Sequence, residues 1–257
     1  MEGIIKNGII CIFDILGYKS FLQNNSVFKC ADNINNIILK LPEDVKNHFI
    51  GLFEKIEKFK IYIPKIDTFL SEKFNFVIVS DTILLVFDLS EIEDFDFSVF
   101  IALVYARLFQ EVSFKNGFPM RGCLDVGSFY FNNNIFAGDT IVNSFKEAET
   151  INFSGLVITS NALRYLQNNG REHVNLFLQE YVNKYIVPLK NNIEEYKYLM
   201  EWAIDLKDMK EFDIKQYIFE SFHAYNKEVS LSVMEKINNT EKIWRYFYMK
   251  RKGRHFA

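Results

Sequence analysis

The chain has 257 residues, 49% of them hydrophobic and 25% charged, and its formal net charge is −3 at pH 7. A chain of this length and composition buries a large core, which argues against extensive disorder. The slightly acidic balance gives no electrostatic basis for wrapping a nucleic-acid backbone.

The cysteines and the apolar runs favour a cytoplasmic protein. Cys11, Cys30 and Cys123 are widely spaced and form no CxxC pair, so neither a disulfide framework nor a zinc site is indicated. The apolar runs are interrupted before the roughly 18 residues that a membrane span needs. The N-terminus also lacks the layout of a signal peptide. We therefore expect neither a membrane nor a nucleic acid as a partner.

Runs of β-branched and aromatic residues alternate with longer helical patterns. In chain order we expect a strand over 8–13, helices over 19–41 and 42–59, strands over 74–80 and 82–87, a helix over 95–116, strands over 121–126 and 128–131, a helix over 140–150, a strand over 156–159 and a helix from 161. The two strand pairs are expected to form hairpins that turn at Ser80-Asp81 and at Gly127, and Ser160 is placed to cap the last helix. This order predicts an α+β fold with a mostly antiparallel sheet whose helices cover one face.

The pattern becomes helical and charged from about residue 167 onward. The clearest periodic stretches are 213–225 and 228–249, and no Gly/Ser/Pro linker separates them from the preceding part. We expect residues 1–166 to form the functional core and residues 167–257 to form a helical C-terminal extension packed on it.

Asp14 and Asp81 each follow an apolar run that is predicted to be a strand. Two carboxylates at the ends of neighbouring strands suit a Mg²⁺ site, because Mg²⁺ prefers oxygen ligands. Gly17 allows a close turn after Asp14, and the amide groups at the start of the next helix can bind phosphate oxygens. Each aspartate alone has an ordinary explanation, as a helix start signal or as a turn residue.

Two basic residues lie near predicted element ends. Arg121 opens the second strand pair, and Lys146 lies in the helix that follows Gly138-Asp139-Thr140. A salt bridge at the strand edge would explain Arg121, and a solvated helix face would explain Lys146. Both alternatives stay open from the residues alone.

The motifs together resemble a known enzyme family. They are Phe13-Asp14-Ile15-Leu16-Gly17-Tyr18, Ser80-Asp81, Arg121-Gly122 with Gly127, and Gly138-Asp139-Thr140 leading to Ala148-Glu149. Their order and spacing resemble the class III nucleotidyl (adenylate/guanylate) cyclases, and more closely the bacterial pyrimidine cyclases of the Pycsar antiphage systems. The resemblance covers roughly residues 8–160 and implies a ferredoxin-like α+β core.

The resemblance also implies a homodimer with active sites at the subunit interface. Asp14, Asp81 and the backbone carbonyl of Ile15 would hold two Mg²⁺ or Mn²⁺ ions in one protomer. The nucleotide would contact Gly17, Tyr18 and Arg121 together with Val77 and Ile135, and the partner would supply groups from the helix that carries Lys146. In the reaction, the ribose 3′-hydroxyl attacks the α-phosphorus and pyrophosphate leaves.

Three positions depart from the pattern of the purine cyclases that the chain resembles. The positions that read the purine base are Val77 and Ile135, and the position of the transition-state arginine is Lys146. Apolar side chains cannot make the hydrogen bonds that select a purine, so a pyrimidine is favoured. Lysine keeps the charge but not the bidentate fork of arginine.

We therefore expect a cyclase that converts UTP, or else CTP, to the 3′,5′-cyclic nucleotide. The product would be a second messenger in antiphage defence that acts on a separate effector protein. Two alternatives stay open, a purine cyclase of the same fold and a catalytically degenerate module that binds a nucleotide.

Overall fold

The computed structural model describes residues 5–132, 135–203 and 213–253. Within these residues, one eight-stranded sheet has the order β2-β3-β1-β4-β6-β8-β7, and β5 pairs with β4 outside this path. Adjacent strands are antiparallel except for the parallel pair β4 and β6, so the α+β fold with a mostly antiparallel sheet is confirmed. The strands are β1 (Ile5–Ile15), β2 (Phe74–Val79), β3 (Thr82–Asp88), β4 (Met120–Asn132), β5 (Ile135–Ala137), β6 (Gly155–Ile158), β7 (Val182–Pro188) and β8 (Glu194–Met200).

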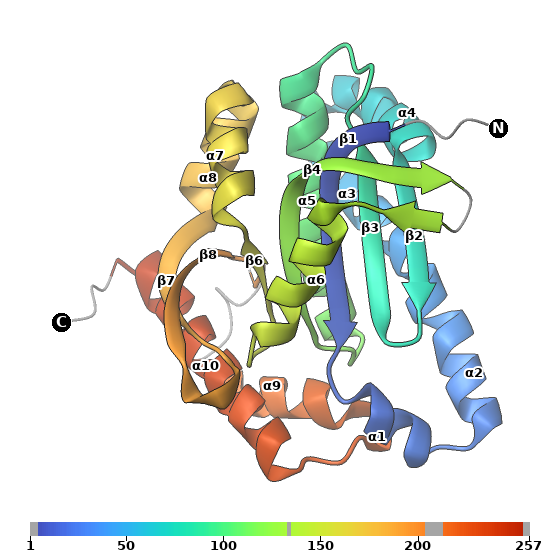
Figure 1. The fold of residues 1–257 in the computed structure, drawn as a ribbon, viewed down its shortest axis with the longest axis vertical. Coiled ribbons are helices and arrows are strands. Elements are labelled where there is room, and N and C mark those ends of the chain that lie inside the picture. The colour runs from blue at the N-terminus through green and yellow to red at the C-terminus, as the bar shows by residue number, and fades with distance from the viewer. Residues whose placement is uncertain (1–4, 133–134, 204–212, 254–257) are drawn as a thin grey trace.

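Helices lie on both faces of the sheet (Figure 1). They are α1 (Tyr18–Gln23), α2 (Val27–Asn36), α3 (Leu41–Glu54), α4 (Ile63–Lys73), α5 (Phe95–Lys115), α6 (Asp139–Thr150), α7 (Ser160–Asn169), α8 (Glu172–Tyr181), α9 (Asp213–His223) and α10 (Leu231–Arg251), with short 3₁₀ turns at Ile38–Lys40, Glu57–Tyr62, Lys190–Asn192 and Ala224–Asn226.

The alternation of side chains along β1 explains the two covered faces. Ile9, Cys11 and Phe13 belong to the main core with α3 and α5. Ile10 and Ile12 belong to a second cluster on the other face, against which Ile141 of α6 packs. The expectation that helices cover one face was therefore wrong, because α6 covers part of the opposite face.

Helix α5 is long and apolar enough to cross a membrane, and it is the one described helix that is. Of its most apolar window, 89% is buried inside the protein. This degree of burial is that of a core helix.

The second predicted hairpin was misplaced. Strand β4 continues through Gly127, which lies opposite Gly8 of β1, and the hairpin partner is β5. A Cβ atom at Gly127 would lie 2.3 Å from Oγ1 of Thr140 in α6. This glycine therefore serves close packing of α6 on the sheet and not a turn. The hairpin between β2 and β3 is confirmed, and Ser80 in its turn has a φ of 60°.

The segment over 19–41 is not one helix, because local hydrogen bonds divide it. The amide of Asn25 donates to the carbonyls of Phe21 and Tyr225, and the hydroxyl of Ser26 caps α2 by accepting from the amide of Lys29. Helix α4 was missed, and α7 is capped by Thr159 instead of Ser160.

The segment after residue 167 is not wholly helical, contrary to expectation. Strands β7 and β8 form an antiparallel pair that extends the central sheet beyond β6. Helices α9 and α10 then pack around Trp202 and Trp244, and Leu16 and Phe114 of the preceding part join the same cluster. The proposed division at residue 166 stays a prediction.

Candidate functional site

Asp14 and Asp81 lie at the same end of the sheet. Asp14 is the last but one residue of β1 and pairs with Thr82 of β3 on one side and with Arg121 of β4 on the other. The next amide of β1, that of Ile15, donates to the carbonyl of Asp81 at 2.9 Å. The structure therefore brings these two predicted acidic residues to one corner of the molecule.

Arg121 binds the carboxylate of Asp14. Its Nε and Nη2 atoms lie 2.7 and 2.6 Å from Oδ2 of Asp14, and its Nη1 donates to the carbonyls of Glu149 and Ile151 at 3.3 and 3.1 Å. Both contacts to Asp14 fall on one oxygen. In the described parts of the chain, no hydrogen bond reaches Oδ1, so this oxygen can take a cation without displacing Arg121.

Burial and neighbouring charges act on the carboxyl of Asp14 in opposite directions. Burial raises the pKa of its carboxyl, Arg121 opposes this rise, and the negative charge of Asp81 raises the pKa further. A contribution from Asp81 requires that the two carboxylates lie within range of each other. A cation between two such carboxylates would relieve their mutual repulsion.

The turn after β1 is fixed by the backbone. The amide of Leu16 donates to the carbonyl of Pro119, and Gly17 has a φ of 79°, a left-handed conformation that glycine adopts without strain. Tyr18 begins α1. Burial raises the pKa of its phenol, and the negative charge of Asp81 raises this pKa further. Helix α1 has only six residues, so its dipole is small.

Val77 shares a face of the sheet with Asp14. It pairs with Leu84, which in turn pairs with Ile12, two residues before Asp14 on β1. Side chains two residues apart on a strand point to the same face, so Val77 and Asp14 both lie on the α6 side of the sheet.

Ile135 and Lys146 are not brought to Asp14 within one chain. Ile135 pairs with Asn132, eleven positions beyond Arg121 on β4 and so roughly 35 Å further along the strand at the usual rise per residue. It is 66% exposed. Lys146 is exposed on α6 and makes no contact with Asp14 in the described parts of the chain.

The C-terminal segment adds two lysines that were not singled out from the sequence. Lys190 lies in the turn between β7 and β8, and its charge lowers the pKa of Asp14. Lys236 lies on α10. The charge of Arg121 lowers the pKa of Lys236, and the charge of Asp14 raises it. The β-branched and aromatic residues on either side of residues 189–192 are the signal that could have revealed this hairpin.

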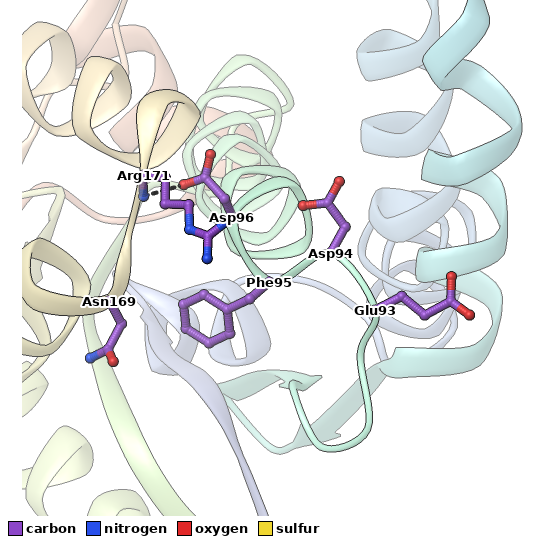
Figure 2. Close-up of a pocket in the computed structure, with 6 residues that line it drawn as sticks. All are labelled: Glu93, Asp94, Phe95, Asp96, Asn169 and Arg171. Atoms are coloured by element: carbon purple, nitrogen blue, oxygen red, sulfur yellow. Dashed lines mark hydrogen bonds between the residues drawn. The ribbon is translucent and has the colours of Figure 1, made fainter.

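A cavity of about 620 Å³ lies at the other end of the sheet, near the start of β1 (Figure 2). It is lined by Glu93, Asp94, Phe95, Asp96, Asn169 and Arg171, and it contains none of the predicted site residues. The carboxylate of Asp96 accepts hydrogen bonds from the amides of Arg171, His173 and Val174. Asp96 therefore anchors the start of α8, and we assign this cavity no ligand.

The acidic corner, formed by Asp14 and Asp81, offers the oxygen donors that a hard divalent ion prefers. Within the described residues, no group of three or more His, Cys, Asp or Glu side chains could hold a metal, so the chain offers the carboxylates of Asp14 and Asp81 with nearby backbone carbonyls. Mg²⁺ is commonly bound by one or two carboxylates, with waters and substrate phosphates as the remaining ligands. Two carboxylates are therefore sufficient.

No protein-family model matches the chain, and no curated protein matches it. Among solved structures, it is similar to the adenylyl cyclase CyaB from P. aeruginosa, with a TM-score of 0.50 and 10% identity over 78% of this chain and 96% of that one. It also matches the catalytic core of a rhodopsin-guanylyl cyclase with converted specificity, with a TM-score of 0.47 and 12% identity over 79% and 99%. A third match is a bacterial light-regulated adenylyl cyclase, with a TM-score of 0.44 and 11% identity over 85% and 99%. The identities are low and the last two scores are weak, so the likeness to CyaB concerns the fold alone: the chain shares the fold of an adenylyl cyclase.

Proposed function

We propose that this chain is a nucleotidyl cyclase that converts a pyrimidine nucleoside triphosphate to its 3′,5′-cyclic monophosphate and pyrophosphate. The observation that carries the proposal is the meeting of Asp14 and Asp81, beside Arg121, at one end of a sheet with an adenylyl cyclase fold. UTP is the favoured substrate and CTP is the next.

In the proposed enzyme, the acidic residues would bind metal ions and the basic residue would bind phosphate. Asp14 and Asp81, with the carbonyl of Ile15, would hold two Mg²⁺ or Mn²⁺ ions, which when bound activate the 3′-hydroxyl and neutralise the triphosphate. Arg121 would donate to a phosphate oxygen through the one N–H of Nη2 that is not used by Asp14, since Nη1 is taken by the carbonyls of Glu149 and Ile151. The turn at Gly17 and the ring of Tyr18 would bound the nucleotide on the α1 side.

The choice of a pyrimidine rests on Val77. This residue packs against the apolar cluster of Ile10, Ile12 and Leu84 on the face that carries Asp14, so the wall it forms offers no hydrogen bond to a purine edge. A site without such groups loses most of its means of selecting adenine or guanine.

A homodimer would complete the site. Ile135, Val142 and Phe145 are 66%, 48% and 41% exposed, and they lie on the β5–α6 unit that also carries Lys146. Exposed apolar side chains of this size favour a subunit interface, and a partner's Lys146 would then reach the polyphosphate. The resemblance to the antiphage cyclases supports a cytoplasmic second-messenger role with a separate effector, and the three free, buried cysteines agree with a reducing compartment.

The ion pair between Asp14 and Arg121 favours one alternative. A carboxylate that is already neutralised by a guanidinium needs no metal, as in a catalytically degenerate module that only binds a nucleotide. Such a module and the enzyme differ in turnover, so one assay separates them.

The test is incubation of the purified chain with each of ATP, GTP, CTP and UTP and with Mg²⁺ or Mn²⁺, followed by chromatographic resolution of the products. We expect a cyclic pyrimidine nucleotide, and its loss by a factor of about 10³ or more in Asp14→Asn and Asp81→Asn, since each removes a metal ligand. Asp44→Asn, which alters an exposed acid on α3, is the matched control. Cyclic product from ATP or GTP alone would favour the purine cyclase, and no product from any substrate would favour the binding module.

A further inference from the structure

Helix α10 docks next to the acidic corner through polar contacts with one loop. The amide of Asn239 donates to the carbonyl of Asn152 at 2.9 Å, and the hydroxyl of Thr240 accepts from the amide of Ser154 at 2.9 Å. Residues 152–154 lie in the connection between α6 and β6. The contacts are buried, so they fix the helical turn that begins at Lys236.

The same loop also contacts Arg121 and the β7–β8 turn. The carbonyl of Ile151 accepts from Nη1 of Arg121, and Ile151 forms a β-bridge with Leu189, the residue before Lys190. The amide of Asn152 donates to the carbonyl of Pro188 at 3.2 Å. Three separate segments, β4, the β7–β8 turn and α10, therefore deliver one cation each to the surroundings of this loop. Figure 1 shows α1, α9 and α10 at the end of the sheet to which β1 points.

Contacts with residues 151 and 152 bring the segments that carry the three cations into one neighbourhood. Burial lowers the pKa of Lys236, and the charges of Arg121 and Lys190 lower it further, while Glu235 and Asp14 oppose them. The Nζ atom of Lys236 donates to the carbonyl of Ser232 at 3.2 Å. In the described parts of the chain, neither lysine forms a salt bridge.

The three cations of this cluster face the carboxylates of Asp14, Asp81 and Glu235, so the charges are close to balanced before any metal ion binds. Like charges that are partly removed from water repel one another, and an anion in the cluster relieves that repulsion. Two divalent ions on Asp14 and Asp81 would then give the corner a large excess of positive charge. The complementary ligand is therefore a polyanion of several charges and not a single carboxylate.

We propose that Lys236, with Lys190 beside it, binds the polyphosphate of the nucleotide in the same chain that carries Asp14. The inference rests on the proposed function for the identity of the nucleotide, but the polyphosphate site stands on the cation cluster. It makes α10 part of the binding site. The terminal phosphates, and the pyrophosphate that leaves, would lie between α10 and the β7–β8 turn.

The test uses inorganic tripolyphosphate as the probe in isothermal titration calorimetry with Mg²⁺ present. Lys236→Met should weaken binding about tenfold, the effect of losing one charge-assisted hydrogen bond. Lys236→Arg should retain most of the affinity. Lys242→Met, which removes an exposed lysine from the same helix, should leave the affinity unchanged within twofold. Should Lys236→Met fail to fold, Lys190→Met is expected to weaken binding in the same direction.

Turnover provides the second readout. Lys236→Met should raise the KM of the nucleotide by a similar factor and should lower kcat less. Wild-type affinity for tripolyphosphate in Lys236→Met would overturn the inference, even with an active cyclase. Binding that depends on Lys236, in a chain that cyclises none of the four nucleotides, would sustain the polyphosphate site while the proposed function failed.

Discussion

The ion pair between Asp14 and Arg121 can be measured directly in a double-mutant cycle. Asp14→Asn and Arg121→Met keep the approximate side-chain volume and remove one charge each. The side chains are 21% and 11% exposed, and the guanidinium makes two contacts of 2.6 and 2.7 Å with one oxygen. Exposed pairs contribute about 0.2–1 kcal/mol, whereas removing one partner of a buried pair costs about 3–5 kcal/mol. This intermediate pair should therefore give a coupling of about 1–3 kcal/mol.

The assay is urea unfolding of the wild type, both single variants and the double variant at pH 7.5. The single variant Arg121→Met is the more informative one, since it leaves a half-buried carboxylate near Asp81 without a partner. It should bind Mg²⁺ more tightly in the absence of nucleotide, because the positive charge of the guanidinium no longer repels the ion, and it should bind tripolyphosphate more weakly. A coupling below about 0.5 kcal/mol, or unchanged Mg²⁺ affinity in Arg121→Met, would refute the idea that Arg121 and a metal share Asp14.

Three further predictions concern stability. Gly127→Ala should destabilise the fold by about 1–3 kcal/mol, because its Cβ would meet Thr140 at 2.3 Å, while Gly51→Ala, with nothing within 4 Å, should not; thermal unfolding of both checks this. Burial lowers the pKa of Lys227 from 10.5 to about 7, so the unfolded state binds more protons between these values and the wild type should gain stability as pH rises through that window. Lys227→Met should lack this gain in urea unfolding at several pH values. Burial raises the pKa of Asp96, but hydrogen bonds from backbone amides and a histidine lower it overall. Asp96→Asn should therefore reduce the free energy of unfolding by about 1–3 kcal/mol at pH 7. In urea unfolding at several pH values, this difference from the wild type should vanish as the pH falls through the lowered pKa.

The parts of the fold that could be predicted from sequence are those where a local pattern decides the structure. Strand β1 is an apolar run, and the β2–β3 hairpin is two such runs around a turn, so each can be recognised without information from distant parts of the sequence. Gly127 was misread, because a glycine between two strand-like runs predicts a turn, whereas here the missing side chain makes room for Thr140. Only the packing of α6 on β4 distinguishes the two roles.

The candidate site also contains residues that local sequence reveals and residues that it does not. Asp14 and Asp81 stand at strand ends that the sequence marks, and pairing of β1 with β3 places them together. Lys190 and Lys236 could not be found by motif, since a lysine in a turn and a lysine on a helix are both ordinary surface residues. Their position depends on β7 and β8 joining the sheet after β6, which is a pairing between segments far apart in the sequence.

The C-terminal segment supports the position of Arg121. Arg121 is bound to Asp14 and to two carbonyls and pairs with Gly155 of β6, so a sheet that ended at β6 would leave the strand next to Arg121 as an open edge. With β8 and β7 added, the turn at Lys190 bridges to Ile151, whose carbonyl holds Arg121, and α10 docks on the adjoining loop. The cation that neutralises Asp14 is thus held in place by the segment that supplies two further cations. Removing α10 should therefore weaken polyphosphate binding both by the loss of Lys236 and by loosening of the loop that orients Arg121. The second contribution is absent in Lys236→Met, so the single substitution isolates the charge of the lysine from the support that its helix provides.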